Sequence, residues 1–442
     1  MPTDLSPITR MIPMKKSALR FSLATLFSSL SLMAQAAPHY VLEKVVEVSR
    51  HGVRPPTADN RKEMEAGSGR PWVSWLTADG QLTGHGYSAA WLKGQYEGNQ
   101  YRQLGLLGAG CPTEKDIFVW ASPLQRTRAT AEALTDGAFP GCGITIHHSP
   151  EKNDPLFQNQ GPGYATLDQE QQRQGALTAL GGTPADAQKR LQPEISLLKK
   201  AVCQTDKPCP IFDKMWEIKF ASDGRIMITG LDTLAAMAET LRLEWSDNKP
   251  LNQVAFGHAT SAAQVGKLMA LLTPKYDATN DQPYVARRGG SLLMEQITKA
   301  LQQGVTPQQD APPEARWLLY VAHDVNIAYL RTLLDFSWQQ DDYPRGTVQP
   351  AGSLVFERWK ETQSGKRFIR ILFQGQSLDQ IRQLTPIDSD HPLLVTELKF
   401  AGCEKTEAGT LCPYDSVLQR LNQNIDPSLI RPVNYQDHSV SL

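Results

Sequence analysis

Residues 50–56 have the sequence Arg50-His51-Gly52-Val53-Arg54-Pro55-Pro56. They follow the valine-rich residues 40–49, which are typical of a buried strand. Two arginines so placed offer bidentate, permanently charged contacts to phosphate oxygens, and Gly52 allows a ligand to approach the backbone. Their charge also lowers the pKa of His51, and a neutral imidazole can attack phosphorus. The pattern predicts a phosphate site with a histidine nucleophile, although it also occurs in exposed basic turns.

Two more predicted strands end in polar residues. Residues 117–121 form the first, and Ser122-Pro123-Leu124-Gln125 follows with the signals of a helix start. These signals are a serine N-cap, a proline in the first turn and a glutamine that completes a capping box, so Arg126 lies at the beginning of a helix. Residues 317–322 form the second strand, and His323-Asp324 follows it directly.

The three strand ends point to one site. Ligands of open α/β sheets bind at the carboxyl ends of the strands, and the N-terminus of a helix favours an anion. Taken alone, Arg126 is normally a solvated side chain and His323-Asp324 a helix cap. Taken together with residues 50–54, they predict a phosphate site that holds both a nucleophile and a proton donor.

The rest of the chain alternates between strand and helix patterns, with a predicted hairpin at residues 353–373. Helical spacing dominates two other regions that are rich in polar loops. We therefore expect an α/β fold in which a mixed central sheet is flanked by helices and carries an inserted, mainly helical cap. The predicted α/β part comprises approximately residues 37–60, 111–150 and 251–442, and the predicted cap approximately residues 61–110 and 151–250.

The N-terminus predicts export. A basic segment precedes the apolar residues 21–33, and Ala34-Gln35-Ala36 has the pattern of a signal-peptide cleavage site, so residues 1–36 are interpreted as a signal peptide. The apolar stretch is too short for a membrane span. We expect a periplasmic or secreted protein with no membrane anchor. The formal net charge of −1 gives no general basicity that would favour nucleic acid.

The six cysteines predict disulfides, because an even number in an exported chain favours pairing and none of them forms a C-x-x-C motif. Fifteen pairings are possible. The spacing suggests three bonds, two of which close short loops: Cys203 with Cys209, Cys403 with Cys412, and Cys111 with Cys142.

The sequence resembles the histidine acid phosphatases, and within them the bacterial periplasmic phytases. The resemblance lies in residues 50–57 near the mature N-terminus and in His323-Asp324 far downstream. It extends to residues 122–128, to Phe356-Glu357-Arg358-Trp359 and to the layout of the cysteines. It implies an α/β domain with a helical cap, a site between the two, and the same three disulfides.

The resemblance also implies roles for individual residues. His51 is expected to become phosphorylated, and Asp324 to protonate the leaving group as general acid. The expected ligands of the phosphoryl oxygens are Arg50, Arg54, Arg126 and His323. No metal or cofactor is implied, and the sequence contains neither H-E-x-x-H nor a P-loop motif. The expected partner is a small phosphomonoester, bound by a monomer.

The sequence departs from the family where specificity is decided. Phytases often have threonine where Val325 stands, and some have lysine where Ala58 follows Thr57. Thr57, Val325 and His258 are therefore candidate substrate contacts, although His258 is equally well explained as a loop residue. A phytase acting on inositol hexakisphosphate is the first hypothesis, and a sugar-phosphate phosphatase of the glucose 1-phosphate type or a broad-specificity phosphatase is the second. A phosphoglycerate-mutase-like transferase and a non-catalytic phosphate-binding protein are more remote.

Overall fold

The strand that precedes His51 lies in the middle of a mixed sheet. The structure is a computed structural model, which describes residues 39–158 and 163–436. Within these residues the strand order is β10-β11-β8-β7-β1-β6-β2-β3, and β9 pairs with β8. β1, β6, β2 and β3 run parallel, whereas the strands on the other side of β1 are antiparallel. The strands are β1 (Tyr40–Arg50), β2 (Ile117–Ala121), β3 (His147–His148), β6 (Trp317–Ala322), β7 (Ser353–Glu361), β8 (Arg367–Gly375), β9 (Leu394–Glu397), β10 (Glu404–Thr406) and β11 (Gly409–Pro413).

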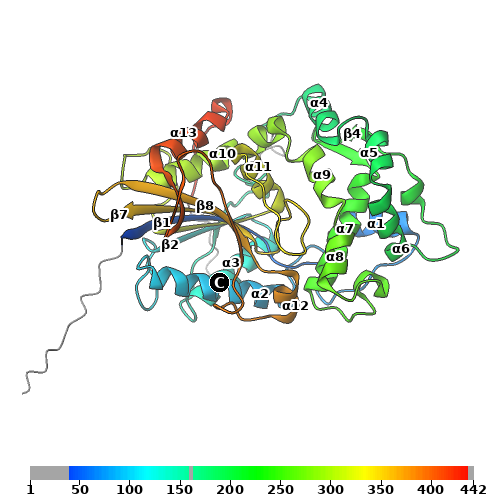
Figure 1. The fold of residues 1–442 in the computed structure, drawn as a ribbon, viewed down its shortest axis with the longest axis horizontal. Coiled ribbons are helices and arrows are strands. Elements are labelled where there is room, and N and C mark those ends of the chain that lie inside the picture. Colours follow the sequence, from blue (N-terminus) through cyan, green and yellow to red (C-terminus); the bar gives the residue numbers. More distant parts are fainter. Residues whose placement is uncertain (1–38, 159–162, 437–442) are drawn as a thin grey trace, which may run out of the picture. The chain divides into compact units, whose positions relative to one another are not determined.

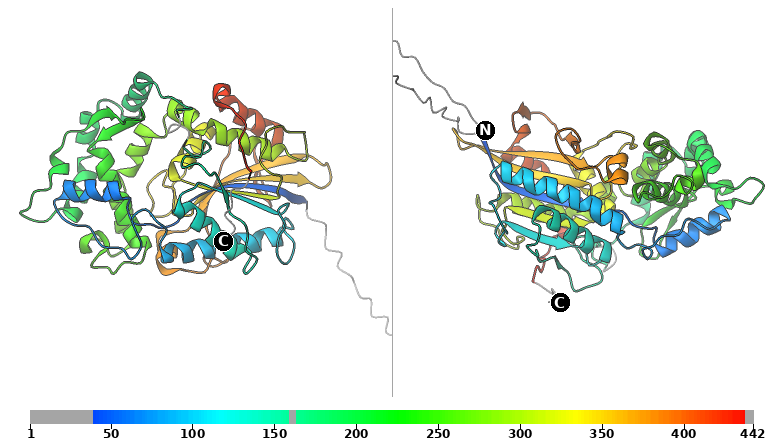
Figure 2. Two further views of the ribbon diagram at one scale, coloured as in Figure 1. Left: turned by 180° about the vertical axis from the view of Figure 1, so that it is seen from behind. Right: turned by 90° about the horizontal axis from the view of Figure 1, so that it is seen from below.

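Helices cover both faces of this sheet (Figure 1 and Figure 2). On one face Val46 and Val48 pack against α10 (Pro283–Gln302), α11 (Asp324–Leu334) and α13 (Tyr414–Asn424). On the other face Val45 packs with α2 (Gly84–Gln103) and α3 (Gln125–Ala138). The valines of β1 therefore face the core on both sides of the sheet, as expected for a strand with both faces buried. The predicted fold class is confirmed.

The cap has a hydrophobic core of its own, formed by helices and one hairpin. Figure 1 shows it beside the sheet, in blue for α1 and in green for the rest. Its elements are α1 (Ala58–Ser68), α4 (Gln169–Leu180), α5 (Pro184–Arg190), α6 (Gln192–Val202), η1 (Pro210–Asp213), β4 (Glu217–Phe220), β5 (Ile226–Thr229), α7 (Leu231–Ser246), η2 (Val254–Gly257), α8 (Ala262–Leu268) and α9 (Leu272–Thr279). Two short elements remain: α12 (Leu378–Gln383) follows β8, and η3 (Pro427–Leu429) follows α13.

The boundary between sheet part and cap differs from the one predicted above. Helix α2, predicted as cap, packs along α3 and joins the core of the sheet part. Glycines allow this close approach: a Cβ on Gly94 would lie 2.0 Å from the Leu134 carbonyl oxygen, and one on Gly137 would lie 2.0 Å from that of Trp91. Residues 254–279, predicted as α/β, instead pack into the cap core. Helical periodicity predicts the helices but not the core that each one joins.

The six cysteines form the three disulfides that the spacing suggested: Cys111–Cys142, Cys203–Cys209 and Cys403–Cys412. Disulfides persist in oxidising compartments, so this is an extracytoplasmic protein. None of the helices in the described part of the chain is both long and apolar enough to cross a membrane. The predicted signal peptide, residues 1–36, lies outside the described residues.

A fully buried ion cluster ties α2 to the sheet. The ammonium group of Lys93 lies 2.8 Å from a carboxylate oxygen of Glu47 on β1 and also contacts Glu97 one turn along α2. It donates to the Ser353 hydroxyl at 2.8 Å. Burial and the neighbouring Glu47 raise the pKa of Glu97, whereas contacts with Lys93 lower the pKa of Glu47 despite its burial. Two carboxyl groups therefore share one cation.

Replacing this cation should destabilise the fold strongly. Lys93→Met leaves both carboxyl groups buried without a positive partner, and we expect it to lower the free energy of unfolding by about 3–5 kcal/mol. The matched control is Lys405→Met, which removes a lysine that is 73% exposed and pairs with Glu397 at 3.0 Å. This change should cost less than about 1 kcal/mol. Urea denaturation followed by circular dichroism measures both, and equal losses would contradict a structural role for the buried cluster.

Candidate active site

Three parallel strands bring the predicted strand ends together. The register of β2, β6 and β1 aligns their last residues. The ladder then continues for one residue: the His51 amide donates to the Ala322 carbonyl at 3.0 Å, and the Ser122 amide to the Val321 carbonyl at 2.9 Å. Because the three strands end at the same level, residues that are far apart in the sequence meet at one edge of the sheet.

His51 is held as a neutral imidazole with one nitrogen available. It is 2% exposed, and its Nδ1 lies 2.9 Å from the carbonyl oxygen of Gly52. A carbonyl only accepts, so this contact places the proton on Nδ1 and leaves the lone pair on Nε2. Burial, followed by the charges of Arg50 and Arg126, lowers the pKa of His51 well below its ordinary value. This is the protonation state that a nitrogen nucleophile needs.

Gly52 serves the protein and not the ligand, contrary to the sequence-based interpretation. Its amide donates to the Thr130 hydroxyl on α3 at 2.8 Å. A Cβ at this position would lie 2.8 Å from Leu82 Cδ1 and 3.2 Å from the carbonyl oxygen of Gly86. The close approach that requires glycine is therefore the one between the His51 loop and the residues around the start of α2.

Arg54 and Arg126 supply positive charge to a cavity of about 400 Å³, which His51 and His323 also line. Arg54 donates to the Pro55 carbonyl at 2.9 Å, and Arg126 to the Gly80 carbonyl at 3.3 Å. In the described part of the chain neither buried Nε has a hydrogen-bond partner. Burial, followed by the nearby Arg54, lowers the pKa of Arg126 to about 10. Both guanidinium groups are thus placed to bind an anion such as a phosphate group.

Arg50 is committed to the protein by several contacts. Its side chain is 1% exposed, and Nη1 donates to the Val348 carbonyl at 2.6 Å. Nη2 pairs with Glu239 of cap helix α7 and lies 3.7 Å from an oxygen of Asp324. Although burial alone raises the pKa of Glu239, Arg242 and Arg50 together lower it to about 2. Arg50 therefore links the end of β1 to the cap.

His323 and Asp324 lie where the sequence predicted, beside His51. The His51 and His323 rings are 5.7 Å apart, and His323 Nε2 lies 3.0 Å from the Ser122 hydroxyl. Burial and then Arg126 lower the pKa of His323 to about 3. Asp324 begins α11 and accepts from the Val325 amide at 3.0 Å through Oδ1 and from the Tyr276 hydroxyl through Oδ2.

The surroundings of Asp324 favour its ionised form, whereas a general acid must carry a proton. Burial opposes ionisation, but Arg50, the Tyr276 hydroxyl and Arg54 hold the pKa of Asp324 well below its ordinary range. A bound phosphate dianion adds negative charge next to Asp324 and offsets the nearby arginines. By the same electrostatic rule it raises the pKa of this carboxyl group. The site therefore couples the proton affinity of Asp324 to phosphate binding.

A second cavity, of about 370 Å³, extends the first one into the cap. The two share lining residues from both parts of the protein: Arg54, Arg225, Asn280, Asp324, Val325 and Tyr329. The second cavity, but not the first, is also lined by Lys275, Glu63 and Asp232. The first cavity is a positively charged site at the strand ends, and the second, which we call the cap cavity, has walls of mixed charge.

The candidate specificity residues divide. Val325 lines both cavities. Thr57 uses its hydroxyl to cap α1, accepting from the Asn60 amide at 3.3 Å, and is not among the described lining residues of either cavity. His258 is exposed at the end of η2 and likewise lies outside both linings.

Glu239 and Tyr276 were missed by sequence reasoning. Both belong to cap helices in which carboxylate and phenol side chains are ordinary, and no motif marks them. Within residues 39–158 and 163–436, no group of three or more histidine, cysteine, aspartate or glutamate side chains is arranged to hold a metal ion.

Comparisons with known proteins agree with this geometry. The chain matches the model of the histidine phosphatase superfamily (branch 2) over residues 41–374, and it belongs to this family. The crystal structure of the phytase of Klebsiella sp ASR1 superposes with a TM-score of 0.85 at 50% sequence identity, covering 89% of this chain and 98% of that one. The protein is a phytase-like histidine acid phosphatase.

Two curated relatives are equally similar in sequence. Phytase AppA of Escherichia coli K12 is 30% identical over 418 residues, which cover 89% of this chain and 94% of the relative. Glucose-1-phosphatase of Salmonella typhimurium LT2 is 30% identical over 417 residues, which cover 91% and 97%. Overall identity to these two relatives does not separate the two activities.

Loss of one cavity arginine should impair catalysis strongly. We expect Arg126→Ala to lower kcat/KM for 4-nitrophenyl phosphate about 10²- to 10³-fold, because a preorganised charge facing the phosphoryl group is removed. Arg128→Ala is the matched control, since Arg128 lies two positions further along α3 and lines neither cavity. Steady-state kinetics measure both variants. Similar kcat/KM values for the two would argue against the anion site.

Proposed function

We propose that this protein is an exported phosphomonoesterase that hydrolyses inositol hexakisphosphate through a phosphohistidine at His51. The observation that carries the proposal is the state of His51. Its Nδ1 is hydrogen-bonded to a carbonyl, so Nε2 keeps its lone pair, and His51 lines the same cavity as Arg54, Arg126 and Asp324. Residues 1–36 are proposed to direct the chain to the periplasm or the medium.

The proposed reaction has two steps. The Nε2 lone pair of His51 attacks phosphorus, so that a P–N bond forms while the ester P–O bond breaks, and Asp324 gives its proton to the leaving alkoxide. Arg54, Arg126 and His323 face the phosphoryl oxygens. A water molecule then attacks phosphorus, Asp324 takes up its proton, and the P–N bond breaks to release phosphate and neutral His51. Acidic conditions favour the first step, because Asp324 must carry a proton when the alkoxide leaves.

The cations that line the cap cavity support a substrate with several phosphates. Arg225 lines both cavities, and its guanidinium pairs with Asp223 in its own hairpin turn while remaining 60% exposed. Lys275 lines the cap cavity from α9. Two cations in a cavity that adjoins the proposed phosphate site suit the further phosphate groups of inositol hexakisphosphate.

A second candidate substrate is a sugar monophosphate such as glucose 1-phosphate. Glu63 and Asp232 also line the cap cavity. Carboxyl groups accept hydrogen bonds from sugar hydroxyls and repel additional phosphates. This acidic part of the wall favours an uncharged sugar ring.

The covalent step can be tested directly. Rapid quenching after mixing with radiolabelled substrate should show label on the wild-type protein, located at His51 by peptide mapping. His51→Ala should show no label and lose essentially all turnover, because no other group replaces Nε2 as nucleophile. Equal turnover by wild type and His51→Ala would rule out the phosphohistidine, and binding without turnover by the wild type would favour a phosphate-binding protein.

The choice between the substrates depends on the two cap cations. The double variant Arg225→Ala/Lys275→Ala should lower kcat/KM for inositol hexakisphosphate about 10- to 100-fold more than for glucose 1-phosphate, since charge-assisted contacts to distal phosphates are lost. Lys219→Ala is the control, because Lys219 is a 56% exposed cation on the same hairpin that lines neither cavity. If the double variant lowered both values equally, the distal phosphates would not be bound there.

A further inference from the structure

A cap helix holds the proposed proton donor, Asp324, by a hydrogen bond. Asp324 accepts a hydrogen bond from the Tyr276 hydroxyl at Oδ2, while its Oδ1 accepts from the Val325 amide at 3.0 Å. Tyr276 belongs to α9, and Asp324 is the first residue of α11. The carboxyl group therefore has one oxygen held by its own helix and the other by a cap helix.

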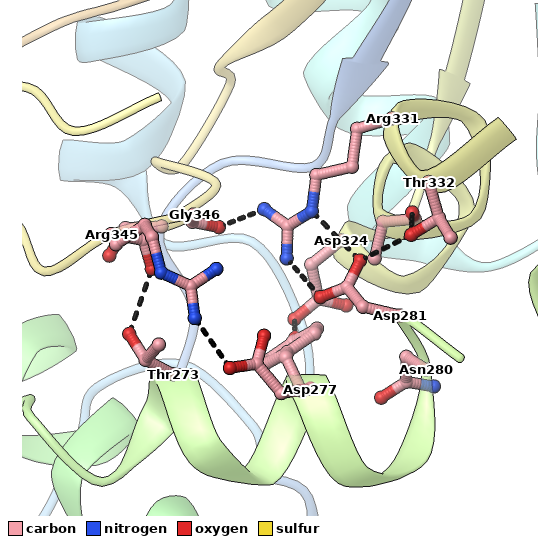
Figure 3. Close-up of polar contacts among 12 residues, drawn as sticks. Thr273, Asp277, Asn280, Asp281, Asp324, Arg331, Thr332, Arg345 and Gly346 are labelled. Carbon is pink, nitrogen blue, oxygen red and sulfur yellow. Dashed lines mark hydrogen bonds and ion pairs between the residues drawn. The ribbon is translucent and has the colours of Figure 1, made fainter. Parts of the chain in front are cut away.

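Hydrogen bonds and an ion pair attach the end of α9 to α11 close to this contact. Asp281, two residues after α9, accepts from Arg331 Nε at 2.9 Å and Nη2 at 2.6 Å, and from the Thr332 hydroxyl at 2.8 Å. The Arg331–Asp281 pair is nearly buried, with side chains 6% and 13% exposed. Figure 3 shows Arg331 and Thr332 of α11 converging on Asp281, with Asp324 beside them. The Arg331 guanidinium carbon also lies 5.8 Å from the centroid of the Tyr276 ring.

A loop reinforces this attachment. Arg345 pairs with Asp277 of α9 at 2.5 Å, and its carbonyl accepts from the Thr273 hydroxyl at 2.8 Å. The next residue, Gly346, accepts from Arg331 (Figure 3). We call Asp277, Asp281, Arg331, Thr332 and Arg345 the α9 clamp. It fixes α9 at both its start and its end, on either side of Tyr276.

We propose that Tyr276 is a positioning residue that orients the Asp324 carboxyl group and sets the pH range in which it delivers its proton, and that the α9 clamp holds Tyr276 in place. The inference rests on the proposed role of Asp324 as general acid. A phenol O–H that donates to a carboxylate stabilises the ionised form, and a protonated carboxyl group gains less from the same donor. Removing the hydroxyl therefore makes Asp324 hold its proton to higher pH.

Other charged groups also face Asp324, and a Tyr276 variant leaves all of them in place. They come from the end of β1 and the following loop, from α7, from α9 itself, from α3 and from the strand end before α11. They are Arg50, Arg54, Glu239, Lys275, Arg126 and His323. Because these groups are unchanged in Tyr276→Phe, a shift in the pH profile of that variant isolates the hydroxyl.

The test uses phosphoenzyme formation, measured by rapid quench as a function of pH. With glucose 1-phosphate, whose alkoxide needs a proton, the rate falls as Asp324 ionises at the basic limb of the profile. Tyr276→Phe should move this limb upward by about one pH unit, since a hydrogen bond to a charged group is lost. With 4-nitrophenyl phosphate, whose leaving group departs without a proton, the limb should not move. Tyr284→Phe is the matched control, because its hydroxyl contacts only the Asp168 amide, at 2.8 Å, among its described hydrogen bonds.

The clamp is tested through coupling. Asp281→Asn removes the charge that holds Arg331 and should move the same limb in the same direction by a smaller amount. If the clamp acts through Tyr276, the double variant Tyr276→Phe/Asp281→Asn should show no larger shift than Tyr276→Phe alone. Additive shifts would overturn the role of the clamp. Thermal unfolding followed by circular dichroism checks that each variant is folded. If Tyr276→Phe does not fold, the shift of the basic limb in Asp281→Asn tests the same proposal.

The outcomes separate this inference from the proposed function. Asp324→Asn should slow phosphoenzyme formation from glucose 1-phosphate far more than from 4-nitrophenyl phosphate. If it does so while Tyr276→Phe keeps the wild-type limb, Asp324 is the general acid and the inference about Tyr276 is wrong. If Asp324→Asn affects both substrates equally, the proposed role of Asp324 fails, and the inference fails with it.

Discussion

Positive charge gathered next to a neutral histidine is the constraint on which this structure depends. Arg54 and Arg126 point into a cavity lined by His51 and His323, and within the described residues their charges contact backbone carbonyls. Isolating a charge from water costs several kcal/mol unless it finds a partner. A phosphate group is a partner of the right size and charge. Burial and the same positive charges disfavour the protonated form of His51, so anion binding and nucleophilicity share part of their cause.

These charges can lie close together because the cap supplies partners for some of them. Glu239 on α7 pairs with Arg50, and the Tyr276 hydroxyl on α9 contacts Asp324. Arg50, at the end of the central strand, therefore belongs electrostatically to both parts of the protein. Through these contacts the cap helices hold residues of the candidate site as well as covering it.

The site and its surroundings are therefore under different constraints. The strand ends fix the positions of His51, Arg126 and Asp324 through the sheet register, which leaves little freedom. The cap cavity is formed mainly by cap residues, among which Arg225 and Asp232 are of opposite charge type. The chain is 30% identical both to a phytase and to a glucose-1-phosphatase, so overall identity to these two relatives does not decide the substrate.

The sequence by itself determined the parts of this protein that depend on local order. Valine-rich strands that end in charged residues, a helix start before Arg126 and the spacing of six cysteines predicted the sheet, the converging strand ends and the disulfides. The prediction of converging strand ends succeeded because parallel strands place their carboxyl ends at one edge of a sheet, whatever lies between them in the chain. The tertiary structure alone decided that α2 joins the sheet part, that Thr57 and His258 lie outside the cavities, and that Glu239 and Tyr276 reach the site. Each of these outcomes depends on a packing partner far away in the sequence, and helical periodicity shows which face of a helix is buried but not what it is buried against.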